Sequence, residues 1–317
     1  MKKLKILHAL SQRPEMTGSG IYVEAIIKES GKSGFSNYRV AGVPADRFDP
    51  AKIVSPADGA YVIFESEPLN FAVPGMSDVM PYKSTLFRDL RGDRLVRYKA
   101  AFTRVLEAAV ERFNPDIIHS NHLFLLSALV RKLFPNLPVV VTCHGTDLRQ
   151  YHNCPQLRPF VKQYCQRLDR IIALTADQKT DIARVYDIPS DRIAVVGGGY
   201  DEKIFNRVPK QPAGTVQILY AGKFNLSKGV PWLLRSLMKI REHDWHLHLA
   251  GSGKGPEYRQ CIDLAEQLGP KVTNHGYVSH QRLAELMKKA HIQAVSYTHL
   301  TLPTITSGCS SRGSPGR

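Results

Sequence analysis

The stretch at residues 219–230, LYAGKFNLSKGV, constrains the fold of this chain more than any other. An apolar run typical of a buried strand ends at Gly222, and the short polar loop that follows carries Lys223 and Lys228. Gly229 then opens a segment whose apolar residues recur at helical spacing. A strand, a basic loop and a helix in this order direct backbone N–H groups and two cations to one point, which suits a phosphate or diphosphate. Taken alone, the stretch also fits an ordinary strand-to-helix turn with solvated lysines.

Length and patterning predict a two-domain α/β protein. The 317 residues are 43% hydrophobic, and strand-like and helix-like segments alternate along most of the chain, which is typical of parallel sheets. The segment 208–214, VPKQPAG, reads as a linker between a first domain at 1–207 and a second at 215–295. No apolar run approaches the roughly 20 residues that cross a bilayer. The first ten residues are read as a buried strand, because their apolar part is too short for a signal peptide.

Charge and cysteine usage narrow the partners and the compartment. The formal net charge of +15 favours anionic partners, such as a nucleotide-sugar or an anionic lipid surface. Nucleic acid is not expected as a partner, because the sequence shows no RNA-binding signature, zinc finger or clustered basic arm. Five cysteines form no CxxC pair and no disulfide-like framework, which predicts a reduced, cytoplasmic protein.

A glycine-containing turn follows the first expected strand, Leu4–Leu10. Gly18 and Gly20 stand where this strand gives way to a helix, so the backbone there can approach a ligand and the helix N-terminus favours negative charge. Their spacing is not GxGxxG, and no acidic residue follows a second strand in the dinucleotide pattern. A dehydrogenase of the Rossmann type is therefore not expected. A flexible turn without a ligand is the alternative.

Three histidines are expected at the carboxyl ends of two strands, where open α/β sheets bind ligands. His119 and His122 belong to PDIIHSNH, and His144 follows the buried run 139–141. A histidine at such an edge can donate to a developing anion or move a proton near neutral pH. Asp147 is either part of this site or a helix cap. No metal is expected, because two histidines three apart lack a third ligand nearby.

Two further segments are candidates for ligand contact. The long stretch 68–94 is rich in Pro, Gly and Met, and it either covers a substrate, with Arg88 and Arg91 meeting an anion, or is a mobile surface excursion. In the second half, the segment AGSGKGPE is another glycine-rich strand-to-helix turn, which contains Gly251 and Gly253.

The order of these pieces resembles the GT-B glycosyltransferases, specifically the large retaining family 4. The matching motifs follow the family's order across residues 4–295: the glycine-bearing loop Thr17–Gly20, PDIIHS, VTCHGTD, RIIALTADQK, VVGGGYDEKIF, LYAGKFNLSKG, HLAGSGKGPE and HGYVSHQRLAELMKKA. The resemblance implies two Rossmann-like domains. It also implies transfer of a sugar from a nucleotide-diphosphate-sugar, with retention of the anomeric configuration.

The resemblance also assigns residues to roles. Gly18 and Gly20 would approach the donor phosphates and the acceptor, and His144 would lie beside the transferred sugar. The remaining donor-side residues are Lys223, Lys228, Gly222, Gly251 and Gly253, of which the lysines would hold the diphosphate. Two fixed cations can stabilise the charge that develops on a diphosphate leaving group, so no metal cofactor is expected. His119, His122, Arg88 and Arg91 are the candidates on the acceptor side.

The function that follows is transfer of a hexose from a UDP- or GDP-linked donor to a glycan or lipid-linked acceptor. We expect this in the synthesis of cell-envelope polysaccharide or glycolipid, in the cytoplasm or peripherally at the inner membrane face. A nucleotide-sugar epimerase of the same fold is one alternative, and a non-catalytic nucleotide-sugar-binding protein is another.

The end of the sequence departs from the family. The family carries two glutamates eight positions apart after the strand that begins near His291, whereas no Glu or Asp follows Glu285 here. Residues 296–317 are rich in Ser, Thr, Gly, Pro and Arg, and SYTHLTLPT resembles translated sequencing-adapter read-through. We therefore expect a non-native tail, an incomplete second domain and a chain that, as written, is poorly soluble and has little activity. The stretch Gly198–Asp201 also differs from the family's Asn-Gly-Val-Asp-like pattern.

Overall fold

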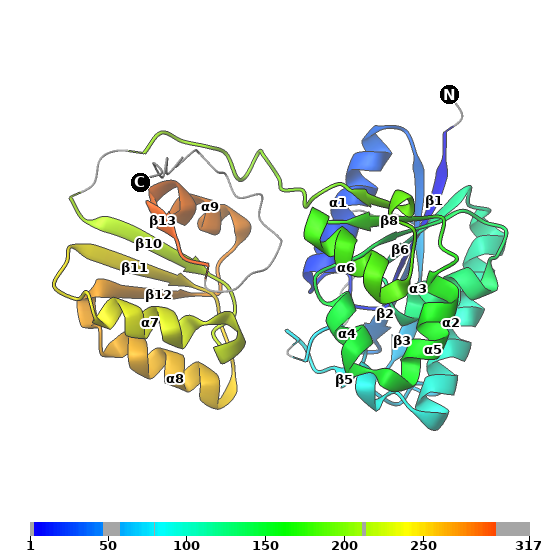
Figure 1. Cartoon of the computed structure of the whole chain (residues 1–317), viewed down its shortest axis with the longest axis horizontal. Helices are drawn as coiled ribbons and strands as arrows, with labels where there is room; N and C mark the ends of the chain where they lie inside the picture. The colour runs from blue at the N-terminus through cyan, green and yellow to red at the C-terminus, as the bar shows by residue number, and fades with distance from the viewer. Residues whose placement is uncertain (1–2, 47–57, 79, 211–213, 296–317) are drawn as a thin grey trace, which may run out of the picture. The chain divides into compact units, whose positions relative to one another are not determined.

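A computed structural model describes residues 3–46, 58–78, 80–210 and 214–295. The chain divides into two compact units, residues 1–198 and 199–317, so the division follows Gly198 at the end of the first unit (Figure 1). The expected tail, 296–317, and part of the expected linker lie outside the described residues.

The first unit contains a seven-stranded parallel sheet in the order β3-β2-β1-β6-β7-β8-β9. Its strands are β1 (Lys5–Leu10), β2 (Ser36–Pro44), β3 (Asp58–Phe64), β6 (Ile117–Asn121), β7 (Val139–Thr142), β8 (Arg170–Ala173) and β9 (Ile193–Val195). The chain runs from β1 outward to β3 and then returns to the other side of β1, so the direction reverses between β1 and β6. In open α/β sheets, ligands bind at the carboxyl ends of the strands beside such a reversal.

Helices cover this sheet, and side-chain caps fix the starts of two of them. They are α1 (Gly18–Lys32), α2 (Gly92–Phe113), α3 (Leu125–Leu133), α4 (Asp147–Asn153), α5 (Arg158–Cys165) and α6 (Ala176–Tyr186). The Thr17 hydroxyl accepts a hydrogen bond from the Gly20 N–H at 2.9 Å, which fixes the start of α1. Figure 1 shows α2, α3 and α5 together on one side of the sheet, and α1 packs against β2.

The segment 68–94 is anchored in the core of the first unit. It contains the short paired strands β4 (Pro74–Gly75) and β5 (Thr85–Leu86) and the turn η2 (Phe87–Asp89). Phe71, Val73, Phe87 and Leu90 are buried in the same apolar cluster as the strands of the large sheet. The alternative of a surface excursion is therefore wrong, since apolar residues spaced along this irregular segment hold it against the domain.

The second unit is built on a four-stranded parallel sheet in the order β12-β11-β10-β13. The strands are β10 (Val216–Ala221), β11 (Trp245–Ala250), β12 (Val272–Gly276) and β13 (Ile292–Gln293), and the helices are α7 (Val230–Met238), α8 (Gly255–Glu266) and α9 (His280–Lys289). Figure 1 shows α7 and α8 on one side of this sheet and α9 on the other. Two separate apolar clusters reflect this arrangement: one lies between the sheet and α7 and α8, and the smaller one lies beneath α9. Here too the chain direction reverses beside the first strand, between β10 and β13.

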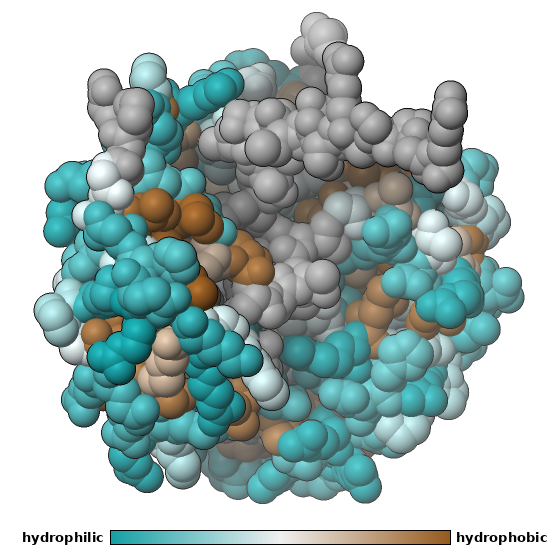
Figure 2. All heavy atoms as spheres, turned by 60° about the vertical axis from the view of Figure 1, so that its left-hand side comes forward, coloured by the Kyte–Doolittle hydropathy of each residue, from teal (hydrophilic) through white to brown (hydrophobic). Residues whose placement is uncertain are grey.

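The described part of the face in Figure 2 is largely hydrophilic. Figure 2 shows hydrophilic side chains over most of the coloured face that it presents, with hydrophobic residues in small groups between them. Among the described helices, none combines the length and the apolar character that a membrane crossing requires.

Candidate functional site

A buried pair of side chains stands at the carboxyl end of β6. His122 follows this strand with a left-handed backbone (φ 71°), and its Nδ1 lies 2.6 Å from Oδ1 of the fully buried Asp147. Nε2 of His122 lies 2.7 Å from the Gln12 side-chain amide nitrogen, which comes from the loop after β1. The amide can only donate, so Nε2 accepts and Nδ1 carries the proton that it donates to the carboxylate. Asp147 is the first residue of α4, and its carboxylate orients His122 rather than capping the helix.

His144 lies next to this pair. It follows β7, its Nε2 donates to Asn121 Oδ1 at 3.1 Å, and its ring centroid is 4.6 Å from that of His122. Burial lowers its pKa well below 6.5, and the neighbouring His122 and His119 lower it further. The imidazole is therefore neutral at pH 7, with Nε2 protonated. Its Nδ1 can accept a hydrogen bond or a proton from a hydroxyl group.

His119 lies in the middle of β6 rather than at its end, so the prediction of its position is wrong. Its Nε2 accepts from the Thr142 hydroxyl at 2.9 Å, and its Nδ1 lies 3.1 Å from Nδ1 of His8 in the neighbouring strand β1. His8 in turn donates from Nε2 to Asn37 Oδ1 at 2.9 Å. Burial lowers the pKa of His119 to about 3 and that of His8 to about 4. Both nitrogens of His119 are used inside the sheet, which makes it a part of the interior network.

The loop from β1 to α1 packs closely on itself. A Cβ atom on Gly20 would lie 2.1 Å from the Pro14 carbonyl oxygen, so only glycine fits there, whereas a Cβ on Gly18 would meet nothing within 4 Å. Gly20 therefore has a structural role in holding the chain of Arg13 and Pro14 against the first turn of α1. Contact of either glycine with a donor phosphate stays a prediction.

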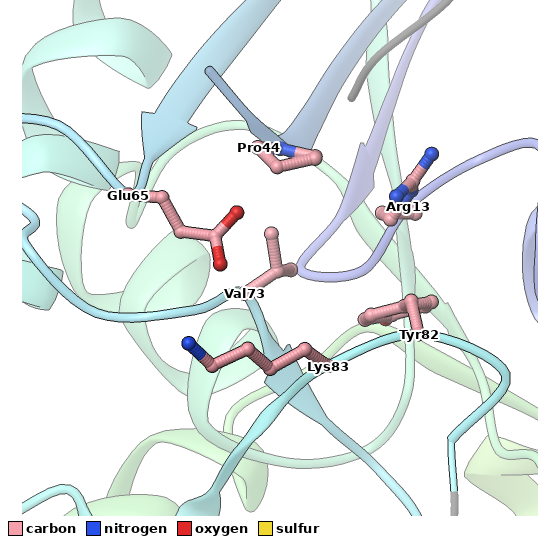
Figure 3. Close-up of a pocket in the computed structure, with 6 residues that line it drawn as sticks. All are labelled: Arg13, Pro44, Glu65, Val73, Tyr82 and Lys83. Atoms are coloured by element: carbon pink, nitrogen blue, oxygen red, sulfur yellow. The ribbon is translucent and has the colours of Figure 1, made fainter. Parts of the chain in front are cut away.

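A small polar pocket lies at the carboxyl ends of β1, β2 and β3. It is lined by Arg13, Pro44, Glu65, Val73, Tyr82 and Lys83, and the Glu65 carboxylate points into it (Figure 3). Its volume of about 10 Å³ accommodates roughly one water molecule or one hydroxyl group. Beside it, Arg13 forms an ion pair with Glu15, and both side chains are less than a tenth exposed. The Arg13 guanidinium also lies 5.3 Å from the centre of the Tyr82 ring.

The predicted site residues Arg88 and Arg91 belong to the segment 68–94, which contributes Tyr82 and Lys83 to this pocket. Neither arginine lines the pocket itself. Arg88 lies 3.8 Å from Asp78, and Arg91 donates from Nε to the Arg88 carbonyl at 2.9 Å. Both arginines are exposed, and the Arg88 carbonyl accepts from Gln156 just beyond α4. The described contacts of both arginines therefore involve their own segment and η3 (Pro155–Leu157), not the carboxyl edge.

In the second unit, the loop from β10 to α7 is fixed at several points. The Tyr220 hydroxyl donates to the Lys223 carbonyl at 2.8 Å, and Asn225 Oδ1 accepts from the Lys228 N–H at 2.9 Å. The Leu226 N–H donates to Glu257 Oε2 in the first turn of α8 at 3.1 Å. The Lys223 side chain is half-buried, and this burial lowers its pKa. The predicted strand, basic loop and helix are confirmed, and they lie beside the β10–β13 reversal.

The second glycine-rich turn packs against this loop. The Gly222 N–H donates to the Ala250 carbonyl at 2.9 Å, and the Phe224 N–H donates to the Ser252 carbonyl at 3.0 Å. Gly251 has φ 150°, and a Cβ atom there would lie 1.8 Å from the Gly222 carbonyl oxygen. At Gly253 the corresponding distance to the Phe224 carbonyl oxygen is 2.7 Å. The glycines allow the two loops to meet, and a role in lining a nucleotide pocket stays a prediction.

Sequence reasoning missed Gln12, Asn121 and Arg13. Gln12 and Arg13 follow β1 and Asn121 ends β6, the two strands that flank the reversal in the first unit. The same strand-end criterion that selected His122 and His144 would have found them. Across the described ranges, no group of three or more His, Cys, Asp or Glu side chains is placed to hold a metal ion.

Two sequence profiles match the chain. Residues 78–203 match Glycosyltransferase Family 4, and residues 215–307 match Glycosyl transferases group 1. The chain belongs to the family 4 glycosyltransferases of the GT-B fold.

Relatives and solved structures agree with this assignment. The chain is 27% identical over 185 residues to an uncharacterised glycosyltransferase of Methanocaldococcus jannaschii, a match that covers 50% of this chain and 45% of the relative. It is 29% identical over 296 residues to the D-inositol 3-phosphate glycosyltransferase of Xylanimonas cellulosilytica. This match covers 81% of this chain and 70% of the relative. The chain thus spans about half the length of the first relative and 70% of the length of the second.

Among solved structures, the sucrose-phosphate synthase of Thermosynechococcus elongatus superposes with a TM-score of 0.70 at 17% identity, over 96% of this chain and 78% of that one. HepE of Anabaena, in complex with UDP and glucose, superposes with a TM-score of 0.60 at 14% identity, over 92% and 74%. At identities of 17% and 14%, this structural likeness shows the fold of the chain alone.

Proposed function

We propose that this family 4 glycosyltransferase binds a nucleotide-diphosphate-sugar through the β10–α7 loop and transfers the sugar to a glycan or lipid-linked acceptor. The observation that carries the proposal is the position of Lys223 and Lys228 in a loop held by Tyr220, Asn225 and Glu257, beside the reversal of the second sheet. A loop backbone fixed by hydrogen bonds, with cations nearby, suits a diphosphate. Such groups need little rearrangement when negative charge develops on the diphosphate.

The chemistry of the proposal is cleavage of the bond between the anomeric carbon and the diphosphate oxygen, with the sugar passing to an acceptor hydroxyl. The leaving diphosphate gains negative charge, which the two lysines stabilise, so the proposed step needs no metal. Retention of configuration and a hexose donor are part of the proposal through the family. The UDP and ADP complexes of the solved neighbours are consistent with a nucleoside-diphosphate donor, and the inositol-phosphate relative supports a hydroxyl of a polyol as acceptor.

His144 is the residue that we assign beside the transferred sugar. Its neutral imidazole, held by Asn121 and by the His122 ring, offers Nδ1 to a sugar hydroxyl or to a proton. Replacement H144Q keeps a polar side chain but cannot exchange a proton near neutral pH. We expect donor-dependent product formation to fall by about 10²-fold, with nucleotide affinity unchanged. An unchanged rate in H144Q would remove His144 from the mechanism.

Product analysis separates transfer from the alternatives. With a UDP- or GDP-linked hexose and no acceptor, a transferase leaves the sugar unchanged, whereas an epimerase converts it to its epimer. With a lipid or glycan extract added, acceptor-dependent release of the nucleoside diphosphate supports transfer. Nucleotide binding without either reaction supports a non-catalytic binding protein. We place the activity in the synthesis of cell-envelope polysaccharide or glycolipid, in the cytoplasm or at an anionic inner membrane face.

A further inference from the structure

The amino-terminal end of β8 carries a second cationic site, at the opposite end of the strands from His144. A surface hollow of about 450 Å³ lies there, between the end of α5, the start of β8 and the turn η4 (Ser190–Arg192). It is lined by Gln166, Arg167, Leu168, Asp169, Arg170 and Arg192. Two parts of the chain therefore bring three arginines to the same hollow: residues 166–170 contribute Arg167 and Arg170, and η4 contributes Arg192.

The acidic residue in the lining, Asp169, does not neutralise the positive charge of this hollow. Within the described ranges, Arg167, Arg170 and Arg192 form no ion pair with a carboxylate. Asp169 is the acidic residue of the lining, and its Oδ2 already accepts from Arg131 Nη1 and from the Val139 N–H, both at 2.8 Å. The hollow thus presents three guanidinium groups and one carboxylate that is engaged elsewhere.

Two of the guanidinium groups are held in place by the backbone. Arg170 donates from Nη1 to the Asp169 carbonyl at 2.8 Å, and Arg192 donates from Nη1 to the Gln166 carbonyl at 3.3 Å. A guanidinium has five N–H donors, so one such bond leaves several for a ligand. Because the side chains of Arg170 and Arg192 are already partly anchored, they lose less conformational entropy when a ligand binds.

The surroundings extend the same charge. Residues 148–168 contain no Asp or Glu, and they include Arg158 and Lys162. These two line a second hollow of about 440 Å³, which shares Gln166 with the first. The cationic surface therefore continues along α5.

We propose that the hollow at Arg167, Arg170 and Arg192 binds a phosphate ester, separately from the donor diphosphate. The planar fork of arginine matches the oxygens of a phosphate group, and three of them around one hollow favour this ligand over an isolated carboxylate. The phosphate belongs either to a lipid headgroup or to a soluble metabolite. The proposal does not rest on glycosyl transfer.

The test uses the full chain carrying K223Q/K228Q, so that the proposed donor site does not compete for the probe. Inorganic pyrophosphate is titrated calorimetrically, and co-sedimentation is measured with phosphatidylcholine vesicles with and without phosphatidylglycerol. R167Q/R170Q/R192Q is compared with R104Q/R112Q/R241Q, which removes the same charge from exposed positions on α2 and near the end of α7. The single variant R192Q is included in case the triple variant folds poorly.

We expect the first triple variant to weaken binding of one probe by at least about tenfold, the second by less than about twofold, and R192Q by an intermediate factor. Binding of pyrophosphate shows that the hollow takes a soluble phosphate group, and binding only to phosphatidylglycerol vesicles identifies a lipid headgroup. Equal weakening in the two triple variants would overturn the proposal, because it would show an effect of net charge alone. Lack of binding to both probes would also overturn it.

Discussion

His122 Nδ1 lies 2.6 Å from Asp147 Oδ1, and this bond joins the residue that follows β6 to the first residue of α4, next to His144. Asp147 is fully buried, and its second oxygen, Oδ2, has no hydrogen-bond partner among the described residues. The carboxylate therefore depends on His122 for much of its stabilisation in the interior. The His122 ring in turn contacts the His144 ring, with centroids 4.6 Å apart, so the pair is positioned to set the orientation of the proposed catalytic imidazole.

Replacing His122 tests this dependence. H122N keeps a residue that tolerates the left-handed backbone, but its shorter side chain cannot reach Asp147. We expect a loss of about 2–4 kcal/mol in the free energy of unfolding, because a buried carboxylate loses its partner. Urea unfolding measures it. H152Q, at an exposed position on the same helix as Asp147, is the control and should stay within about 0.5 kcal/mol of the wild type. A similarly small effect of H122N would contradict the account.

The His8–His119 network predicts a pH dependence of stability. Folding lowers the pKa of these two groups from 6.5 to about 4 and about 3, so the unfolded chain binds more protons below about pH 6.5. The stabilisation is thus complete above pH 6.5 and is lost as the pH falls toward 4, by on the order of 1 kcal/mol per pH unit for each histidine. Urea unfolding at pH 7.5 and 5.5 tests this. The stability of H119Q should depend less steeply on pH than that of the wild type. The control H152Q should show the same pH dependence as the wild type.

The contact between the two glycine-rich turns of the second unit predicts a strong effect of G251A. The added Cβ would lie 1.8 Å from the Gly222 carbonyl oxygen, so the backbone of one loop must move. We expect about 2 kcal/mol or more of destabilisation, and weaker nucleotide binding because the lysine loop moves with it. G214A is the matched control, since a Cβ there meets nothing within 4 Å. Wild-type thermal unfolding and nucleotide affinity in G251A would show that the loops do not depend on this contact.

The lowered pKa of Lys223 predicts how diphosphate affinity changes with pH. Burial favours the neutral amine, so Lys223 loses its proton at a lower pH than an ordinary lysine, and affinity falls on the alkaline side. In K223R the guanidinium stays charged, so the affinity for UDP should remain constant over the same range. Calorimetric titration of UDP between neutral and alkaline pH compares the two. Parallel curves for wild type and K223R would show that Lys223 does not contact the diphosphate.

The alternating architecture and most strand ends could be predicted from sequence, because buried parallel strands are short apolar runs bounded by glycine and polar residues. The strand, loop and helix around Lys223 have local signals of this kind. His144 was found because its motif directly follows such a strand.

The partners of these residues could not be predicted, because they depend on register between strands far apart in sequence. His8 and His119 lie 111 positions apart, and only the β1–β6 pairing brings them together. The bond between Asp147 and His122, and the place of Tyr82 over Arg13, likewise need the sheet order and the packing of the 68–94 segment. The pattern of that segment gives no periodicity from which its burial could be read.

The most direct test of the central claim is the affinity of the chain for UDP and GDP, measured calorimetrically for the wild type, K223Q/K228Q and the control K239Q/K288Q. The control removes two exposed lysines from α9 and the end of α7. We predict that one of the two nucleotides binds the wild type and the control equally. The same nucleotide should bind K223Q/K228Q at least about tenfold more weakly. Equal affinity in wild type and K223Q/K228Q would contradict the assignment of the β10–α7 loop as the diphosphate site.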